Sequence, residues 1–369
     1  MANPLFDKLF APHIGSAAPF LFLPNGKRLS YGDFLTTAAK FASAIRDAGL
    51  EAGDRMAVQI EKSPEALAVY AACAITGVIF LPLNTAYAPA EVSYFLTDSG
   101  ARLFLCDPSK LEALAPTAQA AGASILTLGS VGDGSFADLA KAMSPQFKVA
   151  ERSKDDLAAF LYTSGTTGRS KGAMLSQENL LSNAQALAQL WQFSERDTLL
   201  HALPIFHTHG LFVATNVTLL AGGAMMFLPK FDVDQMISHM TRCNTMMGVP
   251  TFYTRLLDHP KFDANLTRHM RLFISGSAPM LSETHTLFEG RTGHKVLERY
   301  GMTETNMNTS NPYEGERRAG SVGFPLSGVE LKITDPDSGL PVPQGEIGVI
   351  EVRGANVFKG YWNMPEKTA

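Results

Sequence analysis

Short apolar runs alternate with segments of helical spacing along most of the chain. The apolar runs are residues 19–24, 55–60, 78–84, 101–107 and 124–129 in the first part of the sequence, and residues 157–162, 198–204, 224–229, 245–250, 272–276 and 296–301 in the second. Helical spacing fills intervals such as 30–49, 63–77 and 177–191. This repeated alternation predicts α/β architecture, with mainly parallel sheets that helices cover on both faces.

The pattern changes in the last fifty residues. Two β-rich runs, residues 328–334 and 346–354, flank a turn-rich stretch that reads DPDSGLPVPQG. Closely spaced short strands with Gly and Pro turns predict an antiparallel or barrel-like β-subdomain. We therefore expect two helix-flanked, mainly parallel sheet subdomains at residues 1–155 and 156–315, followed by a smaller β-barrel-like subdomain at residues 316–369.

Composition and charge exclude several classes of protein. At 369 residues the chain is too long for one ordinary core, and its net charge of −4 gives no general reason to bind nucleic acid or an acidic membrane. The three cysteines form no CxxC pair, which argues against a disulfide scaffold or a zinc site. Without a signal-peptide layout or a membrane-length apolar run, we expect a cytoplasmic protein. The oligomeric state stays open.

A loop rich in glycine and hydroxyl groups follows the run at residues 157–162. The loop consists of Thr163, Ser164, Gly165, Thr166, Thr167, Gly168, Arg169, Ser170 and Lys171. Glycine lets backbone N–H groups approach an anion, hydroxyls add uncharged donors, and a lysine supplies a mobile charge. The spacing differs from GxxxxGK[ST], so this is not a Walker A loop. The pattern predicts a phosphate loop between a strand and a helix near Ser176; the alternative is a flexible surface loop.

The stretch YTSGTTGRSKGAMLS resembles the phosphate loop of the adenylate-forming enzymes, which include acyl-CoA synthetases, firefly luciferase and nonribosomal-peptide adenylation domains. Four further segments match that family in order: PIFHTHGL, SGSAPM, ERYGMTE and GEIGVIEVRGANVFKGYW. The resemblance covers nearly the whole chain. It implies that a carboxylate attacks the α-phosphate of ATP, giving an acyl-adenylate and pyrophosphate, before the thiol of CoA forms a thioester. Positioning and charge neutralisation should dominate such a reaction, because it brings two anions together.

The resemblance also assigns roles in ATP binding. It implies that the loop from Thr163 to Lys171 holds the β- and γ-phosphates, that Thr303 contacts the α-phosphate, and that Glu304 binds Mg²⁺. The remaining residues that it implies for ATP are Ser277, Ala278 and Pro279 along one face of the adenine, together with Glu298 and Tyr300. The alternative for Glu304 is a solvated surface charge.

Two histidines and an arginine concern the acid. The resemblance implies that His207 borders the reacting carboxylate and acts with Thr303 and Glu304 in catalysis, whereas we expect His209 to be structural. Zinc is not expected, because no third ligand has suitable spacing. Arg299 stands where relatives that use fatty or aromatic acids have a small residue, and a guanidinium there would bind a second carboxylate.

The string VLERYGMTETNMN resembles the malonyl-CoA synthetases in particular, so malonate is the expected acid. The malonate site would consist of His207, Arg299, Gly301 and Met302, with Met302 and Thr208 as candidates for setting its size. Methylmalonate stays open, because one methyl group changes binding by only about 1–3 kcal/mol. Three alternatives also remain: an ion pair of Arg299 with Glu298, another small or aromatic acid, and a non-catalytic nucleotide- or acid-binding module.

In the family, the chain continues beyond a stretch like GYWNMPEKT into a C-terminal catalytic domain. An ordinary domain of this kind has roughly 100 residues, and we expect it to be absent here. We therefore expect the 369-residue chain to fold and to bind ATP and malonate, but not to form the thioester.

Overall fold

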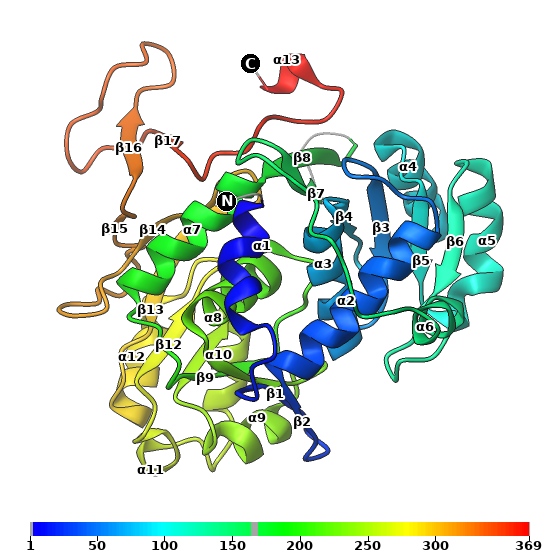
Figure 1. Ribbon diagram of the computed structural model, residues 1–369. Coiled ribbons are helices and arrows are strands. Elements are labelled where there is room, and N and C mark those ends of the chain that lie inside the picture. Colours follow the sequence, from blue (N-terminus) through cyan, green and yellow to red (C-terminus); the bar gives the residue numbers. More distant parts are fainter. Residues whose placement is uncertain (1–2, 164–168, 369) are drawn as a thin grey trace.

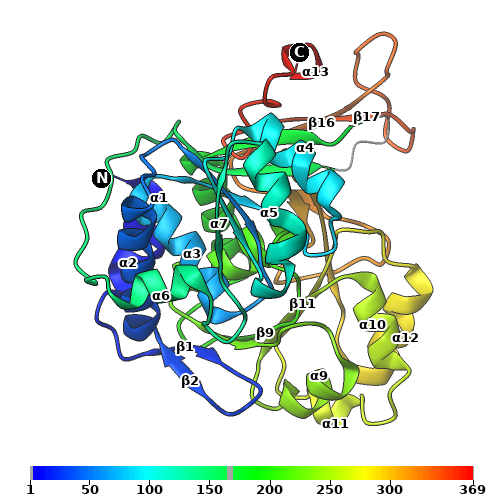
Figure 2. The ribbon, with the colours of Figure 1, turned by 90° about the vertical axis from the view of Figure 1, so that its right-hand side faces the viewer.

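The computed structural model describes residues 3–163 and 169–368. Two large β-sheets with helices around them form most of the molecule, and a small two-stranded sheet lies at one end (Figure 1). The view from the side places the small sheet and the C-terminus together, above both large sheets (Figure 2). The expected α/β class with mainly parallel sheets is confirmed.

The first large sheet has six strands in the order β6-β5-β3-β4-β7-β8. Its strands are β3 (Arg55–Gln59), β4 (Ile79–Pro82), β5 (Leu103–Cys106), β6 (Ser124–Thr127), β7 (Leu157–Thr163) and β8 (Lys171–Ser176). All neighbouring strands are parallel except the β7–β8 hairpin. Every residue of β4 and β5 is buried, as expected of parallel strands that are covered on both faces.

The second large sheet has nine strands in the order β15-β14-β13-β12-β11-β9-β10-β1-β2. Its strands are β1 (Pro19–Phe22), β2 (Arg28–Ser30), β9 (Thr198–His201), β10 (Ala224–Phe227), β11 (Thr245–Gly248), β12 (Leu272–Ser275), β13 (Leu297–Met302), β14 (Asn306–Ser310) and β15 (Phe324–Pro325). The six strands β13, β12, β11, β9, β10 and β1 pair in parallel, and β2, β14 and β15 add antiparallel pairs at the two edges.

Helices cover the large sheets, and several of them follow a residue whose side chain caps the first turn. Ser30 and Ser176, for example, each accept a hydrogen bond from the backbone N–H three residues later. The helices are α1 (Pro4–Leu9), η1 (Ala11–His13), α2 (Tyr31–Asp47), α3 (Pro64–Thr76), α4 (Pro89–Ser99), η2 (Pro108–Lys110), α5 (Leu111–Ala120), α6 (Ser135–Lys141), α7 (Gln177–Leu190), η3 (His209–Thr215), α8 (Asn216–Ala221), α9 (Val233–Met240), α10 (Pro250–Leu257), α11 (Ala264–Thr267), α12 (Ser282–Thr292) and α13 (Pro365–Thr368).

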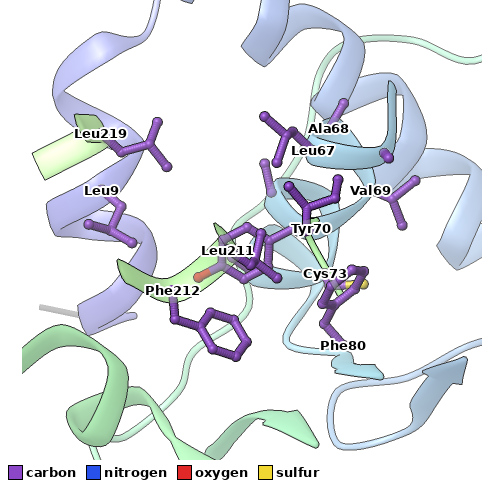
Figure 3. Close-up of a cluster of buried hydrophobic side chains, with 14 of the residues drawn as sticks. Leu9, Leu67, Ala68, Val69, Tyr70, Cys73, Phe80, Leu211, Phe212 and Leu219 are labelled. Atoms are coloured by element: carbon purple, nitrogen blue, oxygen red, sulfur yellow. The ribbon is translucent and has the colours of Figure 1, made fainter. Parts of the chain in front are cut away.

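One continuous core joins the layers of the two large sheets. The ring of Tyr70 on α3 lies 5.5 Å from the ring of Phe80 on β4 and 5.9 Å from the ring of Phe212 on η3 (Figure 3). The Tyr70 hydroxyl donates to Asn216 Oδ1 at 3.2 Å. The helix α3 covers the six-stranded sheet, and η3, a π-helix, follows β9 of the nine-stranded sheet. Their contact therefore fixes η3 between the two sheets.

The small sheet consists of β16 (Val329–Thr334) and β17 (Val349–Gly354), which pair antiparallel as expected. In residues 316–368 the structure shows this two-stranded sheet rather than a closed barrel. The three-domain division stays a prediction, and sheet membership crosses its first boundary: β1 and β2 belong to the nine-stranded sheet, and β7 and β8 to the six-stranded one. No helix in the described part of the chain is long and apolar enough to span a membrane.

Candidate active site

A cavity of about 570 Å³ opens where the β7–β8 hairpin, the turn before η3 and the strand β13 meet. Several residues that the sequence predicts for different parts of the reaction line this one cavity. These residues are Thr163, Lys171, His207, Ser277, Arg299, Gly301, Met302, Thr303 and Glu304. The structure thus brings together residues that lie up to 141 positions apart in the sequence, from Thr163 to Glu304.

Other predicted residues lie elsewhere. Ala278 and Pro279 are exposed in the turn after β12, whereas Ser277 reaches the cavity. Glu298 and Tyr300 alternate with Arg299 along β13 and are not among the residues that line the cavity. The loop residues Ser164, Gly165, Thr166, Thr167 and Gly168 lie outside the described residues.

The predicted phosphate loop lies between two strands, β7 and β8, rather than between a strand and a helix. Thr163 pairs with Lys171 across the β7–β8 hairpin, so the loop begins and ends at the same edge of the cavity. The helix expected near Ser176 does begin there, as α7, but β8 precedes it. Lys171 is therefore the first residue of a strand, and its position on the hairpin brings its side chain to the cavity.

Arg299 is a buried cation without an ion pair in the described part of the chain. Its side chain is 3% exposed, and neither Nε nor Nη2 has a hydrogen-bond partner there. Loss of contact with water lowers the pKa of its guanidinium to about 9. Glu298, the alternative partner, instead contacts His285 Nδ1 at 3.2 Å and accepts from the Gly320 N–H at 3.1 Å. Arg299 thus lines the cavity and has two buried donors without a partner in the described part of the chain.

Gly276 makes room for this guanidinium. A Cβ atom at Gly276 would collide with Cζ and Nη1 of Arg299. The glycine of SGSAPM therefore lets Arg299 lie against the backbone after β12, a function that we did not predict from the sequence. The motif itself was visible, but only the pairing of β12 with β13 reveals what its glycine faces.

His209 also belongs to the cavity, although we expected it to be structural. Its ring is 5% exposed, its Nδ1 lies 3.2 Å from Ser277 Oγ, and its Nε2 has no partner within the described residues. Burial, followed by the charge of Arg299, holds its pKa well below the usual value, so the ring is neutral at pH 7. Burial also lowers the pKa of His207, which lies at the exposed side of the cavity.

At the other end of the cavity, Tyr361 lies between Lys171 and Glu304. The Tyr361 hydroxyl donates to Glu304 Oε1 at 2.6 Å, and Lys171 Nζ lies 4.3 Å from the centre of the Tyr361 ring. Burial and the neighbouring Glu304 carboxylate raise the pKa of Tyr361. Tyr361 was missed in the sequence, although the matching GYW segment contains it.

The segment that carries Tyr361 adds to the edge of the β7–β8 hairpin. Met174 N–H donates to Gly360 O at 3.0 Å, Lys359 N–H to Met174 O at 2.9 Å, and Trp362 N–H to Gly172 O at 2.8 Å. The chain thus returns from the small sheet to the strand that follows the phosphate loop, and this return places Tyr361 in the cavity.

Glu304 fits the expected magnesium ligand. Its carboxylate is 8% exposed and uses one oxygen to accept from Tyr361. Mg²⁺ usually takes one or two carboxylates together with phosphate oxygens and water, so a single buried carboxylate beside a lysine suits a nucleotide-bound cation. In residues 3–163 and 169–368, no three His, Cys, Asp or Glu side chains gather into a metal site of their own.

The two parallel-rich sheets, with this cavity between them, are the architecture of the N-terminal domain of adenylate-forming enzymes. The chain belongs to the AMP-binding enzyme family, which matches residues 15–362.

Three comparisons show where in this family the chain lies. It is 31% identical to a malonate–CoA ligase of Arabidopsis thaliana, over 99% of this chain and 65% of that protein. It is 54% identical to ATP-bound MatB of Rhodopseudomonas palustris, with a TM-score of 0.95, over all of this chain and 73% of the other. A malonyl-CoA ligase bound to methylmalonyl-CoA and AMP is 32% identical, with a TM-score of 0.80, over 98% of this chain and 74% of that one. The chain thus spans about two thirds of the Arabidopsis ligase.

Proposed function

We propose that the chain activates malonate with ATP and Mg²⁺, giving malonyl-adenylate and pyrophosphate, and that CoA is the second substrate of the complete reaction. The observation that carries this proposal is Arg299, a buried guanidinium whose Nε and Nη2 have no partner in the described part of the chain. A monocarboxylic acid has no group for it, whereas the second carboxylate of malonate does.

The charges along the cavity support the same substrate. Arg299 lies among His207, His209 and Ser277, while Lys171 and Glu304 lie with Tyr361. An acid with two carboxylates can place one against Arg299 and direct the other toward the nucleotide. Lys171 would neutralise phosphate oxygens, and Thr303 would donate its hydroxyl to the α-phosphate. Such fixed groups lower the barrier by positioning two anions and neutralising their charge.

We also propose methylmalonate as a substrate, because a similar ligase is known with methylmalonyl-CoA bound. Thr208 and Met302 line the cavity and would limit the size of the side group.

The three cysteines are all buried free thiols, which suits a reducing compartment, so we place the reaction in the cytoplasm.

Replacement of Arg299 tests the proposal. Arg299→Ala should slow malonate-dependent pyrophosphate release, because it leaves a buried carboxylate unpaired. The loss in interaction free energy with malonate should be about 2–5 kcal/mol. Use of propionate, which has no second carboxylate, should change far less. Arg318→Ala is the matched control, because Arg318 is an exposed arginine paired with Glu316. Equal losses with malonate and propionate would show that Arg299 is structural and would overturn the proposal.

Binding can be measured independently of turnover. Calorimetric titration of malonate into the protein, with Mg²⁺ and an ATP analogue that cannot be cleaved between the α- and β-phosphates, should show one site in the wild type and a much weaker one in Arg299→Ala. A wild-type protein that binds propionate as tightly as malonate would contradict the assignment of the acid.

A further inference from the structure

Lys62 makes an unusual contact between the two large sheets. It follows β3 of the six-stranded sheet and precedes α3, yet its Nζ lies 2.9 Å from both Nδ1 and the backbone oxygen of His201 on β9. Its ammonium also lies 4.3 Å from the centre of the Phe227 ring. In residues 3–163 and 169–368, Lys62 forms no ion pair with a carboxylate. Lys62 is only partly exposed, and placing an amine against neutral groups there costs part of its hydration, so the contact requires an explanation.

The partners of His201 fix which of its ring nitrogens carries the proton. The ring has no exposed surface, and its Nε2 lies 2.8 Å from the carbonyl oxygen of Gly210. A carbonyl oxygen can only accept, so Nε2 carries the hydrogen and Nδ1 has the lone pair. Lys62 therefore donates to Nδ1, and it can do so as an ammonium or as a neutral amine. The chain of donors runs from Lys62 through His201 to Gly210.

This chain of donors closes the loop that carries the acid-site histidines. Residues 202–210 leave β9 directly after His201 and return to the His201 ring at Gly210. The Gly210 carbonyl also accepts from Thr215 Oγ1 at 3.0 Å. A Cβ atom at Gly210 would collide with the carbonyl oxygen of Pro204, so the two ends of the loop are in close contact. His207, Thr208 and His209 lie between them and line the cavity.

We propose that Lys62 is a positioning residue for the acid site: by donating to His201 Nδ1 it holds the ring that anchors Gly210, and thereby fixes His207 and His209 in the cavity. Lys62 does not line the acid cavity itself, and it acts through His201. The proposal that these histidines face malonate rests on the proposed function, whereas the effect of Lys62 on their orientation does not.

The test uses the whole chain with ¹⁵N-labelled histidine rings, at one pH near 7. In the wild type, the His201 signals should show a hydrogen on Nε2 and a hydrogen-bonded lone pair on Nδ1. Lys62→Met should shift the ring signals of His201, His207 and His209, while those of the distant His259 stay unchanged. Lys62→Arg, which keeps a donor, should restore the signals in part. The matched control is Lys230→Met, because Lys230 is exposed and makes no side-chain hydrogen bond or ion pair in the described part of the chain.

Ligand binding provides the second readout. Lys62→Met should raise the dissociation constant for malonate about tenfold, an effect typical of one lost hydrogen bond to a charged group, and leave that for ATP within about twofold. Unchanged ring signals of His207 and His209 in Lys62→Met would overturn the proposal. So would equal losses of malonate binding, ATP binding and thermal stability, because they would indicate a purely structural lysine. If the wild type binds no malonate, the proposed function fails, and the ring signals still decide the role of Lys62.

Discussion

At the scale of single residues, the proposed selectivity for malonate depends on the surroundings of the Arg299 guanidinium. Arg299 could be singled out in the sequence because an arginine in that motif is unusual for an open acid tunnel. Its burial and the glycine that faces it could not be predicted, because both depend on the pairing of β12 with β13. The same reason explains why His209 was taken as structural: only the fold places its ring beside Ser277.

Gly276→Ala should therefore change the affinity for malonate indirectly, by displacing Arg299. The added methyl group would collide with the guanidinium and displace it, so we expect the affinity for malonate to fall at least about tenfold, equivalent to about 1.4 kcal/mol. Calorimetric titration measures this. Gly290→Ala in α12 is the control, because a Cβ atom there meets no neighbouring atom and alanine favours the helix. Identical affinities in the two variants would disprove the contact.

Glu304→Gln and Lys171→Ala should separate the metal from the phosphates. An amide in place of the Glu304 carboxylate would be a neutral and weaker ligand, so Glu304→Gln should lose most of the gain in ATP affinity that Mg²⁺ provides. Lys171→Ala should weaken ATP binding with and without Mg²⁺, by about 1.5–3 kcal/mol for a lost hydrogen bond to a charged group. Titrations of ATP with Mg²⁺ and with EDTA distinguish the two effects. A normal response to Mg²⁺ in Glu304→Gln would remove Glu304 from the metal site.

At the scale of elements, the order of strands and helices along the chain was easier to predict from the sequence than which of them pair in the fold. The alternation of apolar runs predicted parallel sheets correctly, because buried parallel strands are apolar throughout. The strand β8 was missed, since its residues KGAMLS form a short run that begins with a lysine and a glycine and leads directly into a helix. The contact of residues 359–362 with β8 joins parts of the chain about 190 residues apart, which no local pattern encodes.

That contact should stabilise the hairpin that carries the predicted phosphate loop. The Trp362 ring packs edge-on against Phe160 at 5.7 Å between centroids, and its Nε1–H donates to Asp98 O at 2.9 Å. Trp362→Ala should lower the free energy of unfolding by about 2 kcal/mol, less than for a fully buried tryptophan. It should also weaken ATP binding, since Tyr361 is its neighbour. Denaturant unfolding measures the first effect, and Trp362→Phe, which keeps an aromatic ring, should lose about half as much. No change in either quantity would show that the segment is not needed.

At the scale of the whole molecule, the core that joins the two sheets buries titratable rings together with apolar ones. β1 and β2 precede the strands of the six-stranded sheet in the chain, yet they complete the nine-stranded sheet. The two sheets therefore cannot move apart without breaking contacts in the core that they share. His201 and His209 lie in this region with almost no exposed surface. The sequence showed both histidines, but not that burial would keep them neutral.

This burial predicts a loss of stability in mild acid. Burial holds the pKa of His201 and of His209 well below 6.5, whereas in the unfolded chain both rings titrate near 6.5. Below pH 6.5 the unfolded state therefore binds protons that the native state does not, so the contribution of the two rings to the free energy of unfolding falls as the pH decreases and is nearly constant above about pH 7. Two such rings should lower it by about 3 kcal/mol between pH 7.5 and pH 5.5. Denaturant unfolding at the two pH values checks this, and His209→Asn, which cannot titrate, should remove about half of the difference. Equal stability of the wild type at both pH values would mean that the two rings titrate in the native protein as they do in the unfolded chain.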